Sequence, residues 1–211
     1  MGPQSSFYRG LSSLTDVVLI NIVTLIGCLP IVTAGAALTA ANRVMSEMVR
    51  DAESYVIRTW WRSFKTNLRQ SLVWWVPAAL LLAGAWLQNW MLGGTTNAST
   101  AGALTALILV AILIITALLV WILPLTAFFT NSALGHLGNA AALSMRYPGR
   151  TVLCLVVTFA PALIFVALPG ARTAAAWFMV VLGVAFVNYL NALIQKPVIS
   201  GLLRASASSW A

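Results

Sequence analysis

The sequence predicts an all-α protein, a polytopic transmembrane helical bundle of about five spans. Of its 211 residues, 61% are apolar and only 8% are charged, whereas a soluble domain carries roughly a quarter of charged residues. Five long segments contain no charged residue at all. Each is long enough for a helix that crosses a hydrocarbon core of about 30 Å, because about 20 residues suffice. Strands of a lipid-facing barrel would alternate in polarity, which these segments do not.

The five predicted spans and the segments between them form a single integral membrane domain over residues 1–211. The spans cover 17–40, 71–92, 103–130, 151–169 and 174–195. Kinks are expected in four of them, because proline lacks a backbone donor and clashes with the preceding turn; these prolines are Pro30, Pro77, Pro124 and Pro161. The first span is the least regular. Pro30, flanked by Gly27 and Gly35, is also compatible with a break into a re-entrant pair of helices.

Between the first two spans, the sequence predicts a cytoplasmic amphipathic interfacial helix over about 43–69. Apolar residues recur there at steps of three and four, and basic residues lie on or beside the opposite side. Each cation near an anionic leaflet contributes about 1 kcal/mol to binding. A role as topology anchor and brace explains the same pattern, because exposed Arg and Trp serve both purposes. The candidate residues for docking a partner or lipid are Arg58, Trp60, Trp61, Arg62, Phe64, Lys65, Asn67 and Arg69.

The distribution of basic residues predicts the orientation. If every segment crosses once, ten of the twelve Lys and Arg residues lie on one side, and only Arg9 and Arg172 lie on the other. The positive-inside rule then predicts a multi-pass protein of the cell membrane with its N-terminus outside and its C-terminus in the cytoplasm. An alternative interpretation takes 17–32 as the apolar part of a signal peptide with a small-residue cleavage site at 34–36. Cleavage there would reverse the count.

Polar side chains inside the membrane gather on one face of the fifth span. Asn188, Asn191 and Gln195 are three and four residues apart, so they share a helix face. Such a face suits either hydrogen bonds to a neighbouring helix or a polar route for a solute. No span contains a charged residue, which argues against a proton-driven pump or a voltage sensor.

Catalytic, metal and cofactor sites are not indicated by the sequence. The only histidine, His136, has no acidic residue in 131–150, and the acids in 47–53 alternate with arginines as a solvated ionic surface would. Cys28 and Cys154 lie inside apolar runs without a CxxC spacing. The net charge is +8, and the basic residues that give rise to it flank the apolar segments. This placement favours anionic lipids over nucleic acid as the partner. We therefore expect a protein that is not an enzyme and has no cofactor.

The segments 21–45 and 55–71 contain a more specific pattern, which consists of Arg58, an aromatic pair at 60–61, Phe64-Lys65, Asn67 and Gln70. In this pattern the chain resembles the YesL-like family of small Gram-positive membrane proteins, which has no assigned biochemical activity. Trp60 stands where that family usually has Phe, which leaves the aromatic role intact. The remainder of the chain matches only in hydropathy and length.

Members of that family are often encoded beside genes for carbohydrate uptake and glycan degradation. The resemblance therefore implies a non-enzymatic accessory or regulatory component associated with carbohydrate uptake. The alternative function is a small permease that moves a solute itself. The expected partners are anionic membrane lipids and a membrane transporter or cytoplasmic protein, and a homo-oligomer is compatible with the small residues at 36, 37, 40 and 41.

Overall fold

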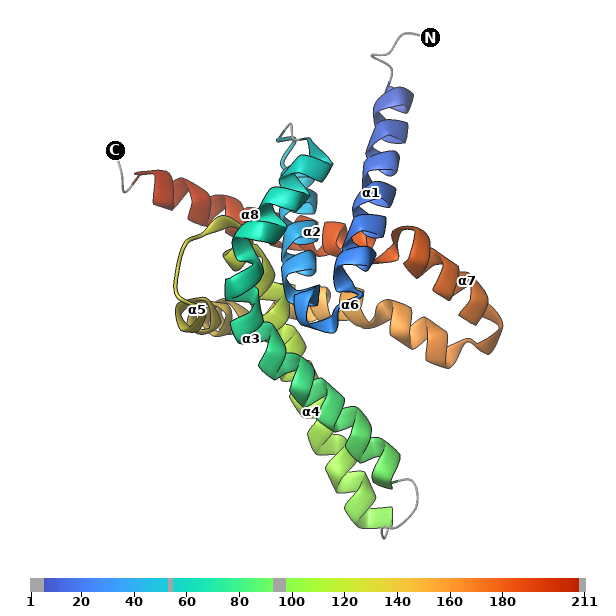
Figure 1. The fold of residues 1–211 in the computed structure, drawn as a ribbon. Coiled ribbons are helices and arrows are strands. Elements are labelled where there is room, and N and C mark those ends of the chain that lie inside the picture. The colour runs from blue at the N-terminus through green and yellow to red at the C-terminus, as the bar shows by residue number, and fades with distance from the viewer. Residues whose placement is uncertain (1–5, 53–54, 93–97, 209–211) are drawn as a thin grey trace.

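The computed structural model describes residues 6–52, 55–92 and 98–208 and confirms an all-α polytopic bundle (Figure 1). Within these ranges there is no strand. The α-helices are α1 (Ser6–Cys28), α2 (Ala34–Val49), α3 (Val56–Leu92), α4 (Ala98–Phe128), α5 (Ala133–Arg146), α6 (Pro148–Ala167), α7 (Arg172–Phe178) and α8 (Val184–Ser208). Two short 3₁₀ turns, η1 (Ile31–Thr33) and η2 (Pro169–Ala171), and one π-helical turn, η3 (Met179–Gly183), complete the connections.

The first predicted span is not one continuous helix. It breaks at Pro30, whose backbone is extended (φ −76°, ψ 108°), and α1 and α2 form an antiparallel hairpin (Figure 1). The Thr33 hydroxyl lies within hydrogen-bond distance of the carbonyl oxygens of Gly27, at 2.7 Å, and Pro30, at 2.9 Å, so its one proton supplies a shared donor that the interrupted helix lacks. The prediction of a single span over 17–40 is therefore wrong, and the alternative of two helices describes this segment.

The other prolines expected to interrupt spans lie inside continuous helices. Pro77, Pro124 and Pro161 are interior residues of α3, α4 and α6. A helix tolerates such a proline where its neighbours satisfy the freed backbone groups. Among these four prolines, only Pro30 ends a helix.

The single helix predicted over 43–69 is also wrong, because the chain turns between α2 and α3. The amide of Asp51 donates to Met48 O and that of Ala52 donates to Glu47 O, which together form a Schellman C-cap. Asp51 takes the left-handed conformation that this cap requires (φ 55°). The amphipathic stretch after the turn is continuous with the second predicted span, and both belong to α3.

Helix α2 lies at the centre of the fold and packs against α1, α3, α4 and α8. Its small residues Ala36, Ala37, Ala40 and Ala41 are fully buried inside this chain, where they allow close helix packing. A second core gathers around Trp121 between the end of α4, α5, α6 and α8. The small residues considered for a homodimer are thus used for intramolecular packing.

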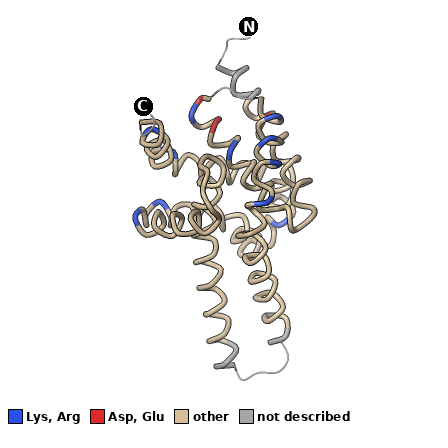
Figure 2. Tube along the Cα trace, turned by 60° about the vertical axis from the view of Figure 1, so that its left-hand side comes forward, with Lys and Arg blue, Asp and Glu red and all other residues tan. Residues whose placement is uncertain are grey.

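Four helical stretches are long and apolar enough to cross a membrane by length and composition, and together they support a membrane protein. They are Val56–Gln88, Gly102–Phe128, Pro148–Ala167 and Pro169–Ser208, while Ser13–Cys28 is a shorter apolar helix. Figure 2 shows that the charged residues gather around the centre of the molecule and toward the chain termini. The hairpin formed by the distal parts of α3 and α4 projects away from that region without any charged residue (Figures 1 and 2).

Candidate functional site

A basic groove lies between α2, the first turns of α3 and the end of α4. It encloses about 1250 Å³. Four basic residues and one acid line it, namely Arg43, Arg58, Arg62, Lys65 and Glu47. Its remaining walls are formed by polar and aromatic residues of α3 and by residues 126–131, which end α4 and lead to α5. We refer to this feature as the basic groove.

One end of the basic groove is fixed by internal contacts of Arg43. Its Nε lies 2.5 Å from Glu47 Oε1, and its Nη1 donates to the Ala127 carbonyl at 2.7 Å. The guanidinium groups of Arg43 and Arg50 lie 4.2 and 4.3 Å from the centre of the Phe128 ring. Burial, together with the nearby Arg43, lowers the pKa of Arg50, although an arginine normally titrates far above neutrality. These contacts join α2 to the end of α4.

The other wall presents cations that have no acidic partner among the residues that the structure describes. Arg58 and Arg62 are exposed on α3 and form no ion pair within the described part of the chain. Lys65 lies with its Nζ 5.5 Å from the centre of the Trp61 ring, which leaves its charge available on the same side. An anionic group entering the groove would therefore meet several unneutralised cations.

The residues proposed for docking divide between the basic groove and the interior. Trp60 is buried, its Nε1 donates to Thr24 Oγ1 at 3.0 Å, and its ring stacks on Phe64 at 5.1 Å. Phe64 is half-buried and packs against the core that Trp60 forms with α2. Arg69 is exposed but does not line the groove. The residues that do line it are Arg58, Trp61, Arg62, Lys65 and Asn67.

Asn67 bonds within α3, whereas Gln70 joins α3 to the segment after α4. Asn67 is buried, and its Nδ2 donates to the backbone oxygen and the hydroxyl of Ser63 at 2.9 and 3.1 Å. Gln70 Nε2 donates to the Asn131 carbonyl at 2.5 Å and so ties α3 to the segment after α4. Sequence reasoning did not find the wall at 126–131, because nothing in the local pattern of that segment signals its contact with α3.

The predicted polar face of α8 connects helices. Asn191 Nδ2 donates to Thr158 Oγ1 of α6 at 3.1 Å, and Gln195 Nε2 donates to Val120 O of α4 at 2.7 Å. Among the described residues, the Asn188 side chain donates within its own helix, to Val184 O at 2.9 Å. All three side chains are buried. The contacts of Asn191 and Gln195 match the role of interhelical hydrogen bonding, and neither side chain lines the basic groove.

Asn21 makes the most extensive polar contact between distant parts of the chain. Its Nδ2 donates to the carbonyl oxygens of Met179 and Val180 at 3.2 and 2.8 Å, and its Oδ1 accepts from the Ala185 amide at 3.0 Å. These groups belong to η3 and the start of α8, where a π-helical turn changes the backbone bonding. The Asn21 side chain of α1 thereby provides hydrogen-bond partners for backbone groups of η3 and α8.

The side chains that line the basic groove are suited to contacts with an anion. Glu47, the one acid among the described residues that line it, is paired with Arg43. The described residues contain no group of three His, Cys, Asp or Glu side chains placed to hold a metal ion. The groove therefore offers positive charge, aromatic surface and hydrogen-bond donors.

Residues 17–90 match the sequence profile of a protein family of unknown function, DUF624. No curated protein and no solved structure matches the chain. The matched range includes α2 and most of α3, and hence all four basic residues of the groove, but not the wall at 126–131. Over this part of its length the chain is similar to DUF624, a family whose function is not known.

Proposed function

We propose that this protein is a non-enzymatic accessory or regulatory component of the membrane, and that its basic groove binds an acidic segment of a partner protein. The observation that carries the proposal is the row of Arg58, Arg62 and Lys65 on one wall, without an acidic partner within the described residues. Charge complementarity of this kind steers association and selects the partner.

The size and composition of the basic groove favour a polypeptide. Pockets for small molecules enclose roughly 300–1000 Å³, and this groove encloses about 1250 Å³. Exposed Arg, Trp and Tyr, the residue types enriched at protein interfaces, are present as Arg62, Trp61 and Tyr55. The partner that we expect is a component of a carbohydrate-uptake system. That expectation rests on the family resemblance of the sequence.

Cross-linking in native membranes tests the proposal. A photoreactive residue at Thr66, which is exposed in the groove, should capture a protein whose cross-linked peptide is rich in Asp and Glu. Arg62→Glu should reduce that product about tenfold, because an attraction becomes a repulsion. Arg69→Glu is the matched control, since it makes the same charge change on an exposed part of α3 outside the groove.

The two variants separate the outcomes. Equal loss in Arg62→Glu and Arg69→Glu would show a general effect of charge and would contradict docking in the groove. Capture of phospholipid alone, with no protein product, would replace the protein partner by an anionic lipid.

We also propose that the basic groove faces the cytoplasm. The positive-inside rule supports this side, because residues 43–69 carry six of the twelve Lys and Arg residues of the chain. The N-terminus was predicted outside on the assumption that 17–40 crosses once. Because α1 and α2 form a hairpin, the start of α1 lies at the groove end of the molecule (Figure 1), and we place it on the cytoplasmic side as well.

Cysteine labelling of intact cells checks this orientation. An impermeant maleimide should modify Trp90→Cys, near the tip of the α3–α4 hairpin, and should leave Ile57→Cys and Leu14→Cys unmodified; all three native side chains are exposed. The unsubstituted protein, with Cys28 and Cys154, gives the background. Modification at Ile57→Cys would overturn the cytoplasmic groove. Modification at Leu14→Cys alone would restore an N-terminus outside.

A further inference from the structure

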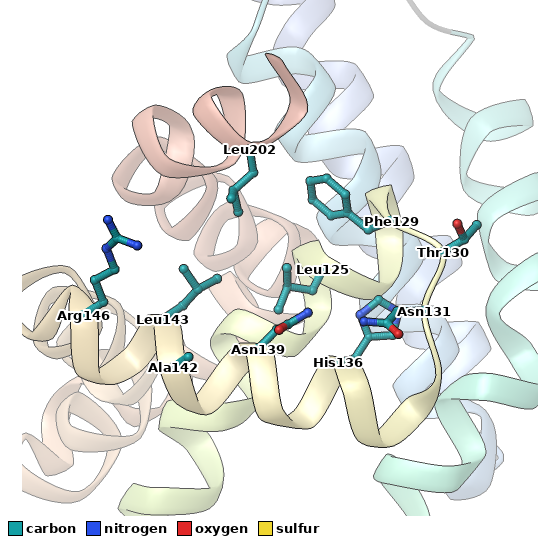
Figure 3. A pocket seen from close by; sticks show the side chains of 10 residues that line it. All are labelled: Leu125, Phe129, Thr130, Asn131, His136, Asn139, Ala142, Leu143, Arg146 and Leu202. Atoms are coloured by element: carbon teal, nitrogen blue, oxygen red, sulfur yellow. The ribbon is translucent and has the colours of Figure 1, made fainter. Parts of the chain in front are cut away.

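A second, smaller cavity lies beside the basic groove, between the end of α4, the segment after it, α5 and α8 (Figure 3). It encloses about 380 Å³, within the range of small-molecule sites. The two features share Phe129, Thr130 and Asn131 as a common wall. We refer to this feature as the α5 cavity.

The histidine in this cavity has no hydrogen-bond partner. His136 is fully buried, and neither Nδ1 nor Nε2 is bonded to any group in the described residues. Burial lowers the pKa of its imidazole, so the neutral ring offers one donor and one acceptor. A buried polar group without a partner is costly, and a ligand group that donates to or accepts from one ring nitrogen would remove part of that cost.

The side-chain amide of Asn131 lies against the first turn of α5. The Asn131 amide lies within 2.5–2.7 Å of the position that a Cβ on Gly135 would take, so it rests on the first turn of α5, next to His136. Its Oδ1 accepts from the Ser132 amide at 2.8 Å. Rotation of this exposed side chain would open the first turn without moving a helix.

The opposite end of the α5 cavity carries a cation. Arg146 lines it in the last turn of α5, and no acidic residue occurs anywhere in 131–150. His136 and Arg146 are ten residues apart, so their Cα atoms are separated by about 15 Å along the helix. Between these ends the walls are mainly apolar, formed by Leu125, Leu143 and Leu202 (Figure 3).

The α5 cavity lies against the side of α5 that carries its polar residues. Leu134, Leu137 and Met145 are exposed on the face opposite His136 and Leu143, as expected where a helix rests on lipid. Asn139 and Arg146 lie on the cavity side and are exposed. A ligand would thus enter from the water side rather than from the bilayer.

We propose that the α5 cavity binds an elongated organic hydroxy acid, with its carboxylate at Arg146, its hydroxyl group at His136 and an apolar chain between them. The hydroxyl can accept from the protonated ring nitrogen or donate to the unprotonated one, so it bonds one of the two nitrogens of the neutral imidazole. The carboxylate supplies the anion that Arg146 lacks. The proposal does not depend on the partner of the basic groove.

Because His136 is the only histidine, one residue reports on binding. The protein, purified without a histidine tag and labelled with ¹⁵N-histidine, is placed in phosphatidylcholine nanodiscs and titrated with 6-hydroxyhexanoate. Both imidazole nitrogen resonances should shift and reach saturation. Hexanoate lacks the hydroxyl group and 1,6-hexanediol lacks the carboxylate, so each should bind about tenfold more weakly.

Two arginine variants locate the carboxylate. Arg146→Gln should weaken binding of 6-hydroxyhexanoate about tenfold and leave that of 1,6-hexanediol unchanged, because the diol has no charge. Arg204→Gln is the matched control, since Arg204 is exposed on α8 and does not line the cavity. The absence of a saturable shift, equal affinity for the three probes, or equal effects of the two variants would each overturn the proposal.

Discussion

Replacing Asn21 by leucine is expected to lower the free energy of unfolding by about 3 kcal/mol, at about 1 kcal/mol for each hydrogen bond lost. The side chain is fully buried, and it bonds the backbone at Met179, Val180 and Ala185. Leucine has a similar size but no polar atoms, so it would leave two carbonyl oxygens and one amide without their partner. The loss should loosen α1 from η3 and α8.

The matched control for this variant is Asn188→Leu. Asn188 is also a buried asparagine, but its side chain donates to Val184 O in its own helix. Its replacement should cost less than about 1 kcal/mol. Chemical unfolding of both variants in the same detergent, followed by far-UV circular dichroism, measures the difference. Equal destabilisation would contradict the role of Asn21 as a tie between distant helices.

The fold class could be predicted from the sequence because lipid imposes a simple rule on it. Uncharged runs of sufficient length form helices, and the last four predicted spans overlap the long apolar helices of the structure. From the sequence alone, a break at Pro30 and a single span over 17–40 were both compatible with the first apolar segment. The sequence does not show that the Thr33 hydroxyl would satisfy the carbonyl oxygens of Gly27 and Pro30, and this contact accompanies the turn.

The candidate site could be predicted only in part. Periodicity identified the basic face of the helix that includes Arg58 and Arg62, both of which line the basic groove. It also placed Trp60 on the apolar side of that helix, yet both Trp60 and Trp61 were predicted to dock a partner, whereas Trp60 is buried and Trp61 is exposed. The wall at 126–131 is distant in sequence, and only tertiary packing brings it to α3.

The α5 cavity shows the same limit more strongly. A lone histidine without an acidic neighbour is usually incidental, and local sequence gives no sign that His136 is buried without a partner. Its place depends on how α5 packs against the end of α4 and on Leu202 of α8. Sequence patterns report helix faces, whereas unsatisfied groups emerge only when several faces meet.

Replacing Gly35 by alanine is expected to destabilise the protein by about 2 kcal/mol, through overpacking between α2 and α3. A Cβ at this position would lie 2.6 Å from Trp75 Cβ and 2.8 Å from Trp75 Cγ. These atoms are next to the backbone, so no rotation of the tryptophan side chain can move its Cβ away. The two helices would have to separate, which would also disturb the hydrogen bond from Trp75 Nε1 to Ile31 O at 2.7 Å.

Gly84→Ala is expected to raise the stability instead. Gly84 lies on α3, the helix whose Trp75 approaches Gly35. Nothing lies within 4 Å of the Cβ that this variant would add, so the higher helix propensity of alanine should stabilise α3 by up to about 1 kcal/mol. Both variants add one methyl group and differ only in what it meets, so their unfolding midpoints in one detergent should move in opposite directions. A rise in stability for both would mean that α2 and α3 do not approach this closely at Gly35. That result would also weaken the basic groove, since its two walls are set by the same pair of helices.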